Sequence, residues 1–397
     1  MASSSSIKSR HVAVIGAGAA GLVRRESFDE KVTPSSSSRG RNRDFPFAIR
    51  SGESRDPRRF PSHGEVLAYL QDFAKEFGIE ELIRFETTVV RVSPAAESDG
   101  GEGIGKWRIE STEKEKKIHR DEIYDAVVVC NGHYIEPRLA EIPGISCWPG
   151  KEMHSHNYRL PSPFKDQVVV VIGSSASAVD ISRDISGFAK EVHVASWSNP
   201  ADTFIKQNGY TNIWMHSMIE RVHEDGSVVF QNGKTVLGDV IMHCTGYKYH
   251  FPFLETNGEV TVDDNCVGPL YKHVFPPALA PSLSFVGIPY RQVDLGYFVG
   301  SGKEDMMVET KTMKATFEGL GIPKRFTHCL GIDQFEYYDW LGSQIGCSGT
   351  EEWRKEMSLP IFLRKMKHPE SYRDEWEDHH LVDQAYQDFS LYISTKR

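Results

Sequence analysis

The sequence predicts an α/β fold built on parallel β-sheets, and three observations support that class. Short apolar runs rich in β-branched residues alternate with helical patterns over most of the chain. Two of these runs lead directly into a glycine-containing loop and then into a helical pattern. From Lys303 onward the sequence becomes charged, aromatic and helical, and it contains no convincing strand. We therefore expect parallel sheets followed by a helical cap in the C-terminal region.

The predicted strands are apolar runs rich in Val and Ile that end at turn-forming residues. They cover residues 12–15, 87–92, 107–110, 126–130, 168–172, 191–195, 228–230, 240–244 and 283–286. Helices are predicted between strands, at residues 64–77 and 176–188. The polar, glycine-rich stretch AAESDGGEGIGKW at residues 95–107 is expected to be a hairpin loop, because it separates two strand patterns.

Length and composition indicate a globular protein with room for two domains. The chain has 397 residues, and no apolar run reaches the roughly 18 residues that a membrane-spanning helix needs. The polar N-terminus MASSSSIKSR has no signal-peptide segment behind it, which favours a cytoplasmic protein. A formal net charge of -9 argues against general binding to nucleic acid, which requires a basic surface. The six cysteines show no CxxC spacing, so neither a metal site nor a disulfide framework is predicted.

The run VAVIGAGAAG places Gly16, Gly18 and Gly21 at GxGxxG spacing directly after a strand. In such a loop the first glycine makes a tight turn, and the second lets a pyrophosphate approach the backbone. The third lets the helix pack close to the strand, and the N-terminus of that helix offers N–H groups to the phosphate charge. The motif indicates a Rossmann-like, dinucleotide-binding domain.

The run VVVVIGSSASAVDISRDI repeats this layout at Gly173, with Ser175 and Ala178 at the second and third glycine positions. Alanine is an accepted variant at the third position, whereas serine narrows the space for a phosphate but adds a hydroxyl group. The following strand, EVHVAS, ends without the Asp or Glu that binds the ribose of NAD, which favours NADP. The predicted fold is therefore α/β with two Rossmann-like dinucleotide-binding domains.

Two further predicted strands break at a glycine, at Gly132 and at Gly246. A glycine at the carboxyl end of a buried strand suits close approach of the backbone to a ligand. It also suits a simple turn, and the sequence leaves both interpretations open.

The segment WPGKEMHSHNY resembles the FxGxxxHxxx(Y/F) signature of flavin-containing monooxygenases, with Trp148 in place of the leading Phe. Gly150, His154 and Tyr158 occupy the remaining positions, and the segment lies between the two glycine loops, as that family requires. The stretches RDFPF, HCTGYKYHFPFL, YKHVFPPALAPSLSFVGIP and GTEEWRKEM resemble the plant branch of the family that S-oxygenates methylthioalkyl glucosinolates.

This resemblance implies a FAD-binding domain that is interrupted by an inserted NADP-binding domain. Residues 1–160 would form the first part of the FAD domain, 161–250 the NADP domain, and 251–397 the completion of the FAD domain with its helical C-terminal region. FAD would lie on the first loop and NADP on the second. The residues implied to contact the cofactors are Gly16, Ala17, Gly18, Ala19, Ala20, Gly21, Gly173, Ser174, Ser175, Ala176, Ser177 and Ala178.

The activity that the resemblance implies is NADPH- and FAD-dependent oxygenation of a thioether by O2, which gives a sulfoxide. No protein nucleophile is required, because the cofactor supplies the chemistry. His154 and Tyr158 are interpreted as structural residues that organise the crossover between the domains. The expected partners are a small thioether and O2, without nucleic acid or a membrane span, and no oligomeric state is predicted.

The chain departs from the family pattern at three places, of which Ser175 at the middle glycine position of the NADP loop is the minor one. After Leu22 the family continues with a full helix and a second strand whose final acidic residue binds the FAD ribose, whereas TPSSSSRG is typical of a linker. The family pattern resumes at Arg43, so we expect several tens of residues to be missing. After Pro289, YRQVDLGYFVGSGKEDMM replaces part of a long helix. The loss of a helix, a strand and a ribose-binding acid predicts weaker FAD binding.

Three alternatives remain open on the sequence. The chain could be a catalytically impaired relative with a decayed FAD site that retains NADP or partner binding. A relative that oxygenates amine nitrogen or ketones would share the same scaffold. A disulfide reductase would also have two dinucleotide domains, but no redox CxxC follows the first loop.

Overall fold

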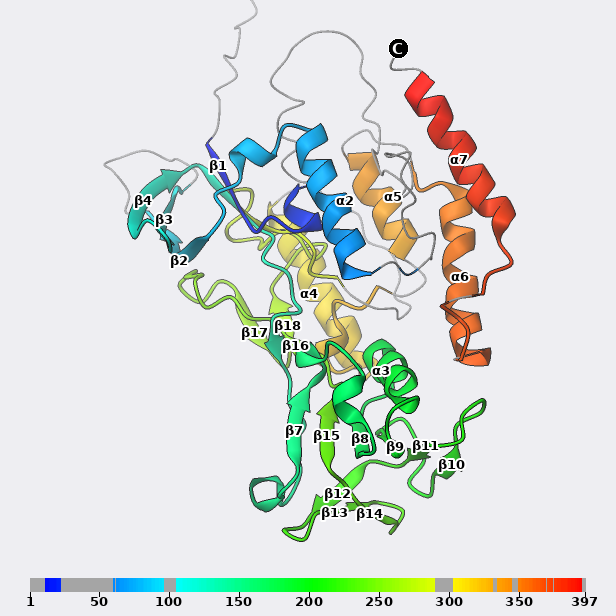
Figure 1. The fold of residues 1–397 in the computed structure, drawn as a ribbon. Coiled ribbons are helices and arrows are strands. Elements are labelled where there is room, and N and C mark those ends of the chain that lie inside the picture. Colours follow the sequence, from blue (N-terminus) through cyan, green and yellow to red (C-terminus); the bar gives the residue numbers. More distant parts are fainter. Residues whose placement is uncertain are drawn as a thin grey trace, which may run out of the picture. The chain divides into compact units, whose positions relative to one another are not determined.

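The computed structural model describes residues 11–22, 60, 62–95, 105–289, 303–330, 334–344, 349–368, 370–373 and 375–394. The chain forms two compact units (Figure 1). Unit 1 takes in the chain up to His133 together with Tyr249–Leu359 and the part from Trp376 onward. Unit 2 comprises Tyr134–Lys248 and Pro360–Glu375. The predicted hairpin loop and the departures from the family pattern after Leu22 and Pro289 lie largely outside the described residues.

Unit 1 contains a parallel sheet with the strand order β1-β5-β19. Its strands are β1 (Val12–Ile15), β5 (Ala126–Val129) and β19 (Leu283–Phe285), and both neighbouring pairs are parallel. Val127, Val129, Leu283 and Phe285 are almost fully buried in one apolar core with Ile15. Burial of β5 and β19 explains why these two strands appear in the sequence as continuous apolar runs, whereas β1 is buried only at Ile15.

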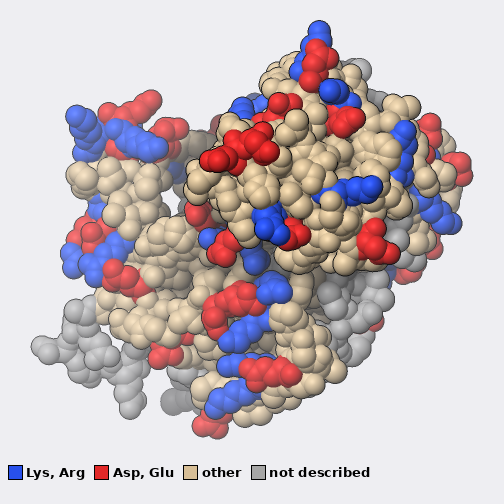
Figure 2. All heavy atoms as spheres, turned by 90° about the horizontal axis from the view of Figure 1, so that it is seen from below, with Lys and Arg blue, Asp and Glu red and all other residues tan. Residues whose placement is uncertain are grey.

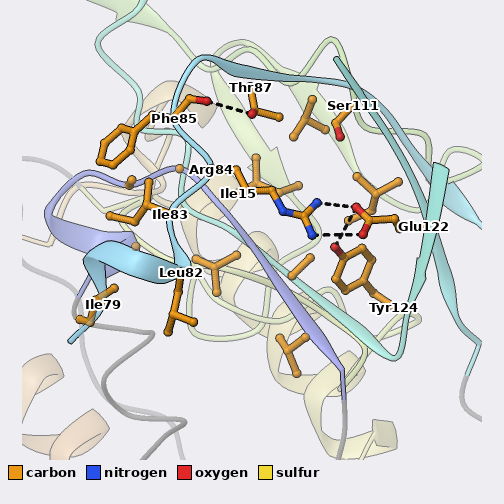
Figure 3. Close-up of a pocket in the computed structure, with 18 of the residues that line it drawn as sticks. Ile15, Ile79, Leu82, Ile83, Arg84, Phe85, Thr87, Ser111, Glu122 and Tyr124 are labelled. Carbon is orange, nitrogen blue, oxygen red and sulfur yellow. Dashed lines mark hydrogen bonds and ion pairs between the residues drawn. The ribbon is translucent and has the colours of Figure 1, made fainter. Parts of the chain in front are cut away.

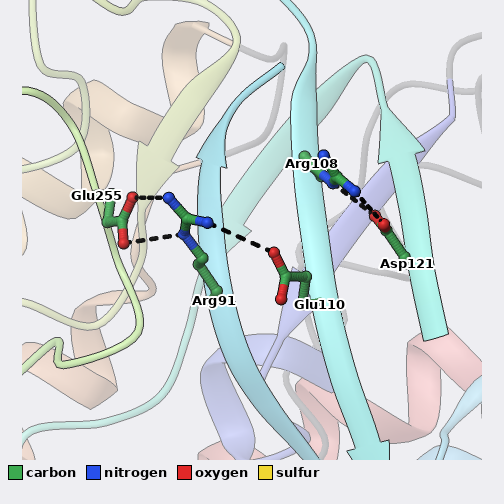
Figure 4. A network of polar contacts seen from close by, with 5 residues as sticks. All are labelled: Arg91, Arg108, Glu110, Asp121 and Glu255. Atoms are coloured by element: carbon green, nitrogen blue, oxygen red, sulfur yellow. Dashed lines mark hydrogen bonds and ion pairs between the residues drawn. The ribbon is translucent and has the colours of Figure 1, made fainter. Parts of the chain in front are cut away.

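An antiparallel sheet of unit 1 consists of β2 (Thr87–Pro94), β3 (Trp107–Glu113) and β4 (Ile118–Tyr124). β2 pairs with β3 as the predicted hairpin requires. Exposed ion pairs cross this sheet and its surroundings: Arg91 contacts Glu255 at 2.7 Å and Glu110 at 3.6 Å, and Arg108 contacts Asp121 (Figure 4). Because water screens these pairs, they contribute little to stability.

Unit 1 contains one helix near the N-terminus and most of the helices that the sequence predicts for the C-terminal region. Helix α2 (His63–Glu76) begins at Ser62, whose hydroxyl accepts the Glu65 N–H, and it buries Phe73 against Leu22. The helices of the C-terminal region are α4 (Lys303–Gly319), α5 (Gln334–Gln344), α6 (Glu352–Lys367) and α7 (His379–Ser394). The shift to helical structure after Lys303 is therefore confirmed. No described helix is long and apolar enough to cross a membrane.

Unit 2 contains a sheet with the order β10-β11-β9-β8-β15-β7, in which every pair except β10 with β11 is parallel. The strands are β7 (Lys151–His154), β8 (Val168–Ile172), β9 (Glu191–Ala195), β10 (Phe204–Lys206), β11 (Ile213–His216) and β15 (Val240–His243). Helix α3 (Ala176–Ser186) connects β8 to β9. This βαβ arrangement confirms a second Rossmann-like fold in the described chain.

The central strand β8 is buried on both faces. Val169 and Val171 pack against the Ile181 side of α3, whereas Val170 packs in a second core with Phe230. That second core includes residues of the small antiparallel sheet β12 (Ile219–Val222), β13 (Ser227–Phe230) and β14 (Thr235–Leu237). The short strands that complete the fold are β6 (Glu136–Pro137), β16 (Tyr247–Lys248), β17 (Thr261–Asp263) and β18 (Cys266–Gly268).

The strands that the sequence analysis did not predict are short or lie at sheet edges. β7 has the polar sequence KEMH and pairs only with β15 on one side in the described chain, and β4 is the polar edge strand IHRDEIY. An edge strand that faces water lacks the apolar pattern of a central strand. The predicted domain boundaries remain a prediction. The contact-defined unit 2 begins earlier, at Tyr134, because β7 pairs with β15, and it also takes in Pro360–Glu375.

Each unit contains a buried pair of hydrogen-bonded histidines. In unit 1, His328 Nε2 accepts the N–H of Val267 at 2.9 Å, so His328 Nδ1–H donates to His273 Nδ1 at 3.0 Å. In unit 2, His193 Nδ1 and His216 Nε2 lie 3.0 Å apart. Burial lowers the pKa of His273 to about 4 and that of His216 to about 3.

Because these histidines are buried, we expect the free energy of unfolding to decrease in mild acid. The unfolded chain protonates them near pH 6.5, whereas the folded chain resists protonation down to about pH 4. Between these values the unfolded state binds more protons, so the free energy of unfolding falls as the pH falls, by up to about 1.4 kcal/mol per pH unit for each histidine. Urea unfolding at several pH values in this window measures the slope. A His273→Asn variant should show a shallower slope, and an unchanged slope would contradict the assignment.

Candidate functional site

The first glycine loop follows β1 at the carboxyl edge of the parallel sheet in unit 1. Gly16 has φ +111°, and a Cβ built on it would lie 2.3 Å from the carbonyl oxygen of Cys130. A Cβ on Gly21 would lie 2.0 Å from the carbonyl oxygen of Gly16. A Cβ on Gly18 would meet no atom of the described chain within 4 Å. The loop is thus closed around its first and third glycines and open at the second.

This geometry fits the phosphates of a dinucleotide. Ala17 and Gly18 connect the strand to a helical turn at residues 19–22, in which Leu22 N–H donates to Gly18 O at 3.0 Å. Ala19 and Ala20 therefore lie in the first turn of a helix, where backbone N–H groups point toward the open side of the loop. A pyrophosphate can approach the backbone of Gly18, because glycine has no side chain and no other atom of the described chain fills the space beside its Cα.

The neighbouring strand ends bring further groups to the same sheet edge. His133, which follows β5, donates its Nδ1–H to the carbonyl oxygen of Gly287 at 2.8 Å, and burial lowers the pKa of His133. A Cβ on Gly287 would lie 3.3 Å from the Cβ of Ala20, so this turn closely approaches the loop helix. Gly132, with φ +75°, meets no atom at its Cβ position within 4 Å. Its positive φ shows that it forms a turn, and the open space leaves room for a ligand.

A cavity of about 410 Å³ lies along β1 (Figure 3), and its lining includes no residue of β5. Its lining includes β1, the segment around Ile83 and Phe85, and residues of β3 and β4. Arg84 crosses it to Glu122 with an N–O distance of 3.1 Å, and Tyr124 OH donates to the same carboxylate at 3.3 Å. The Arg84 guanidinium holds the pKa of Glu122 below its usual range.

The edge of β1 that faces this cavity has no partner strand in the described chain. His11 O and Ile15 O accept backbone N–H groups on the β5 side, so the backbone groups of Val12 and Val14 point to the other side. In a doubly wound sheet, the second strand lies beside the first on that side. The cavity therefore lies where the sequence analysis expects a strand of the family pattern to be missing.

The second glycine loop repeats the geometry of the first. Gly173 follows β8 with φ +126°, and its Cβ would lie 2.5 Å from the carbonyl oxygen of Cys244, just as Gly16 meets Cys130. Ser175 is the N-cap of α3, but its hydroxyl does not cap the helix. The N–H groups of Ala176, Ser177 and Ala178 in the first helical turn are therefore available to a phosphate.

Serine hydroxyl groups occupy the position where an NAD-binding fold has an acidic residue. Ser196 directly follows β9, and its Oγ lies 2.7 Å from Ser198 Oγ, which lies 2.8 Å from Ser174 Oγ in the glycine loop. Trp197, between them, is 74% exposed. A site without a carboxylate here does not repel the 2′-phosphate of NADP. The sequence showed the missing acid but gave no signal that Ser198 reaches the loop.

The monooxygenase-like segment around Trp148 has structural contacts within unit 2. The indole of Trp148 covers Gly150, where any side chain would collide with it, and its Nε1–H donates to Gly226 O at 3.1 Å. His154 donates its Nε2–H to Gly246 O at 3.0 Å and accepts the N–H of His156 through Nδ1. Gly246 thus forms a turn that the histidine fixes.

The last residue of this segment, Tyr158, also has a structural contact. Its hydroxyl donates to Asp184 on α3, and its ring stacks on Phe164. These contacts support the interpretation that His154 and Tyr158 are structural residues. Among the described residues, no group of His, Cys, Asp and Glu side chains could hold a metal ion.

Comparison with known proteins shows which family the chain belongs to. The family model for flavin-binding monooxygenase-like proteins matches residues 41–211 and 201–296. The chain belongs to the flavin-binding monooxygenase family. This family uses FAD and NADP, which confirms both the predicted cofactors and the enzyme class.

Individual relatives extend the match of this flavin-binding monooxygenase over nearly the whole chain. Flavin-containing monooxygenase FMO GS-OX-like 3 from Arabidopsis thaliana is 73% identical over 88% of the chain and 80% of its own length. FMO GS-OX-like 4 from the same plant is 64% identical over 98% of the chain and 99% of its own length. The solved structure of S-allyl-L-cysteine S-oxygenase from Allium sativum superposes with a TM-score of 0.85 at 48% identity and covers 96% of the chain.

The alignments also support a deletion within this flavin-binding monooxygenase. The alignment with FMO GS-OX-like 4 runs over 450 positions, whereas the chain has 397 residues, so at least 53 positions have no counterpart in the chain. The residues matched by the family model begin at residue 41, downstream of the first glycine loop. Residues missing between the loop and residue 41 would account for both observations and for the unpaired edge of β1.

Proposed function

We propose that the chain is a FAD- and NADPH-dependent monooxygenase that transfers one oxygen atom from O2 to the sulfur of a thioether. The observation that carries this proposal is the pair of equivalent glycine loops, Gly16–Gly21 and Gly173–Ala178, in a chain 48% identical to an S-oxygenase. In the balanced reaction, thioether, O2, NADPH and a proton give sulfoxide, water and NADP⁺.

The two loops divide the cofactors between the two units. The residues proposed to contact FAD are Gly16, Ala17, Gly18, Ala19, Ala20 and Gly21, and those proposed to contact NADP are Gly173, Ser174, Ser175, Ala176, Ser177 and Ala178. When bound, the flavin supplies the redox and oxygen chemistry. The chain's own residues bind phosphates through backbone N–H groups, orient the two cofactors and exclude water. No side chain is proposed as a nucleophile.

We further propose a methylthioalkyl glucosinolate as the substrate and the methylsulfinylalkyl glucosinolate as the product. The GS-OX-like relatives at 73% and 64% identity support this class over a smaller thioether. The alternative of an impaired relative is not favoured, because the comparisons lead to enzymes of the same family. Reduced FAD affinity stays a prediction about this enzyme.

The proposal is tested by assaying the purified full chain with added FAD, NADPH and O2 on three substrates. A methylthioalkyl glucosinolate should give its sulfoxide with NADPH consumption, S-allyl-L-cysteine should react more slowly, and a tertiary amine should react least. Faster oxygenation of the amine would contradict S-oxygenation. Equal rates with both thioethers would contradict the glucosinolate assignment alone.

A carboxylate introduced after β9 is expected to weaken the preference for NADPH over NADH. In a Ser196→Asp variant the carboxylate can still accept the Ser198 N–H, which Ser196 Oγ now accepts at 3.1 Å, so the turn is kept. The carboxylate would repel the 2′-phosphate, and we expect the KM for NADPH to rise about tenfold or more while that for NADH changes little. Ser196→Ala is the matched control. Equal changes in both KM values would contradict this assignment.

A further inference from the structure

Residues 370–373, a short segment near the C-terminus, contact α3, the helix that follows the second glycine loop in unit 2. Tyr372 donates its hydroxyl proton to Oδ1 of Asp180, and Arg373 Nη2 donates to Oδ2 of the same carboxylate at 2.7 Å. Arg373 Nε also lies 3.4 Å from the Tyr372 hydroxyl oxygen. Both carboxylate oxygens of Asp180 are therefore engaged by residues almost two hundred positions away in the sequence.

The side chains of Tyr372, Arg373 and Asp180 form a cluster that is at least partly buried. Tyr372 is 3% exposed, and burial together with the hydrogen bond to Asp180 raises its pKa to about 12, so the hydroxyl remains a proton donor. The Asp180 side chain is 20% exposed and that of Arg373 is 42% exposed. A partly buried carboxylate is screened less by water than one on the open surface.

Neighbouring contacts hold the segment in place. Glu370 lies against the turn between β10 and β11, where a Cβ on Gly209 would be 3.6 Å from its side chain. Arg364 Nη2 lies 3.2 Å from Glu375 Oε2, which ties the end of α6 to the residues after the segment. Residues 370–373 thus contact both α3 and an adjacent part of unit 2.

The position of Asp180 gives these contacts a consequence for phosphate binding. Asp180 lies on α3 directly after the first turn, which contains Ala176–Ala178. The N-terminus of α3 attracts anions through its free N–H groups and the helix dipole. A fixed negative charge one turn behind that N-terminus would oppose the diphosphate and the 2′-phosphate of NADPH. Arg373 supplies the positive charge that cancels it.

We propose that Arg373 is a positioning residue for NADPH: it neutralises Asp180 and, with Tyr372, fixes α3 beneath the phosphate loop. This inference rests on the proposed binding of NADPH at Gly173–Ala178. It assigns a role in nucleotide affinity to the C-terminal segment, at a site where Arg373 itself contacts the helix and not the ligand.

The test measures the dissociation constant of NADP⁺ by calorimetry on the full chain, together with kcat and KM for NADPH at saturating FAD and thioether. Arg373→Ala should weaken NADP⁺ binding about fivefold to tenfold and raise KM, with kcat unchanged, because an uncompensated charge near the phosphates acts on binding. Added salt should reduce the effect. Arg373→Gln, which removes the charge but keeps part of the aliphatic chain and a hydrogen-bond donor, provides the same comparison if the alanine variant does not fold.

The decisive variant is Arg373→Ala combined with Asp180→Asn. The amide oxygen can still accept the Tyr372 hydroxyl, but the negative charge is gone, so NADP⁺ affinity should return to within about threefold of the unmodified chain. A merely structural tether would give no such rescue. Arg325→Ala, which breaks the exposed Arg325–Asp264 pair in unit 1, is the matched control and should leave NADP⁺ affinity unchanged.

The outcomes separate this inference from the proposed function. Failure of the unmodified chain to bind NADP⁺ would overturn both. Normal binding by the unmodified chain and equal binding by Arg373→Ala would overturn the role of Arg373 alone. Persistent weak binding in the double variant would also overturn it, because the loss would then not come from the charge of Asp180.

Discussion

The chain is expected to bind FAD about a thousandfold more weakly than the S-allyl-L-cysteine S-oxygenase of Allium sativum, a loss of about 4 kcal/mol at about 1.4 kcal/mol per factor of ten. We expect this loss because one edge of β1 has no partner strand in the described chain. In the described chain no strand pairs with the side of β1 that presents the backbone groups of Val12 and Val14. A second strand would complete the sheet there and carry the acidic residue that binds the FAD ribose.

Titration of the purified chain with FAD, followed by quenching of flavin fluorescence, measures this affinity directly. The matched comparison is a graft in which residues 23–42 are replaced by the aligned segment of FMO GS-OX-like 4, which is 64% identical over 98% of the chain. The graft should restore most of the affinity, because it supplies the segment that the family pattern has between the glycine loop and residue 43. Equal FAD affinity of the chain, the graft and the Allium sativum enzyme would show that the edge of β1 is not a defect.

Substitution of Gly18 by alanine is expected to weaken FAD binding further without loss of stability. A Cβ at this position meets no described protein atom within 4 Å, so folding should be unaffected. The same Cβ would enter the space that the pyrophosphate needs, and we expect a further loss of FAD affinity of about tenfold or more. Equilibrium FAD titration and thermal unfolding, carried out on the same protein, check the two halves of this prediction.

Two other glycines serve as controls for Gly18→Ala. Gly16→Ala should lower stability as well as FAD affinity, because its Cβ would lie 2.3 Å from Cys130 O and its φ is +111°. Gly187→Ala, at the end of α3, has open space at its Cβ and an ordinary φ of -73°, so it should change neither property. Unchanged FAD affinity in Gly18→Ala would show that the phosphates do not lie at this loop.

The class and repeated architecture of the fold could be predicted because buried parallel strands leave a strong sequence pattern. Strands β1, β8 and β9 have the predicted bounds. β8 and β9 are buried over almost their whole length, which favours apolar residues, whereas β1 carries the same pattern although only its last residue, Ile15, is buried. β7 and β4 could not be predicted, because both are edge strands with polar residues. β7 is held by backbone hydrogen bonds to β15, which is distant in the sequence, and β4 by those to β3, the preceding strand of a hairpin.

The candidate site could be predicted only where local backbone geometry dictates the residue. Gly16 and Gly173 are glycines because a carbonyl oxygen of the adjacent strand end occupies the Cβ position, and that constraint is visible as a motif. The contact of Arg373 with Asp180 left no such signal. An ion pair between segments so far apart depends on tertiary structure alone, and each residue by itself has the character of an ordinary surface charge.

The charge distribution agrees with a small-molecule enzyme. On the face shown in Figure 2, Lys and Arg side chains are interspersed with Asp and Glu, and neither sign forms a continuous field. A phosphate-bearing cofactor is instead bound by backbone N–H groups at helix N-termini, which need no basic patch.

Sulfoxide formation measured against the concentration of added FAD tests the central claim most directly. The purified chain is supplied with NADPH, O2 and a methylthioalkyl glucosinolate in excess. We expect little or no sulfoxide without added FAD and a saturable rise as FAD is added. The amount of sulfoxide formed should equal the amount of NADPH consumed. Absence of sulfoxide at every FAD concentration, or sulfoxide formed independently of FAD, would contradict a flavin-dependent S-oxygenase.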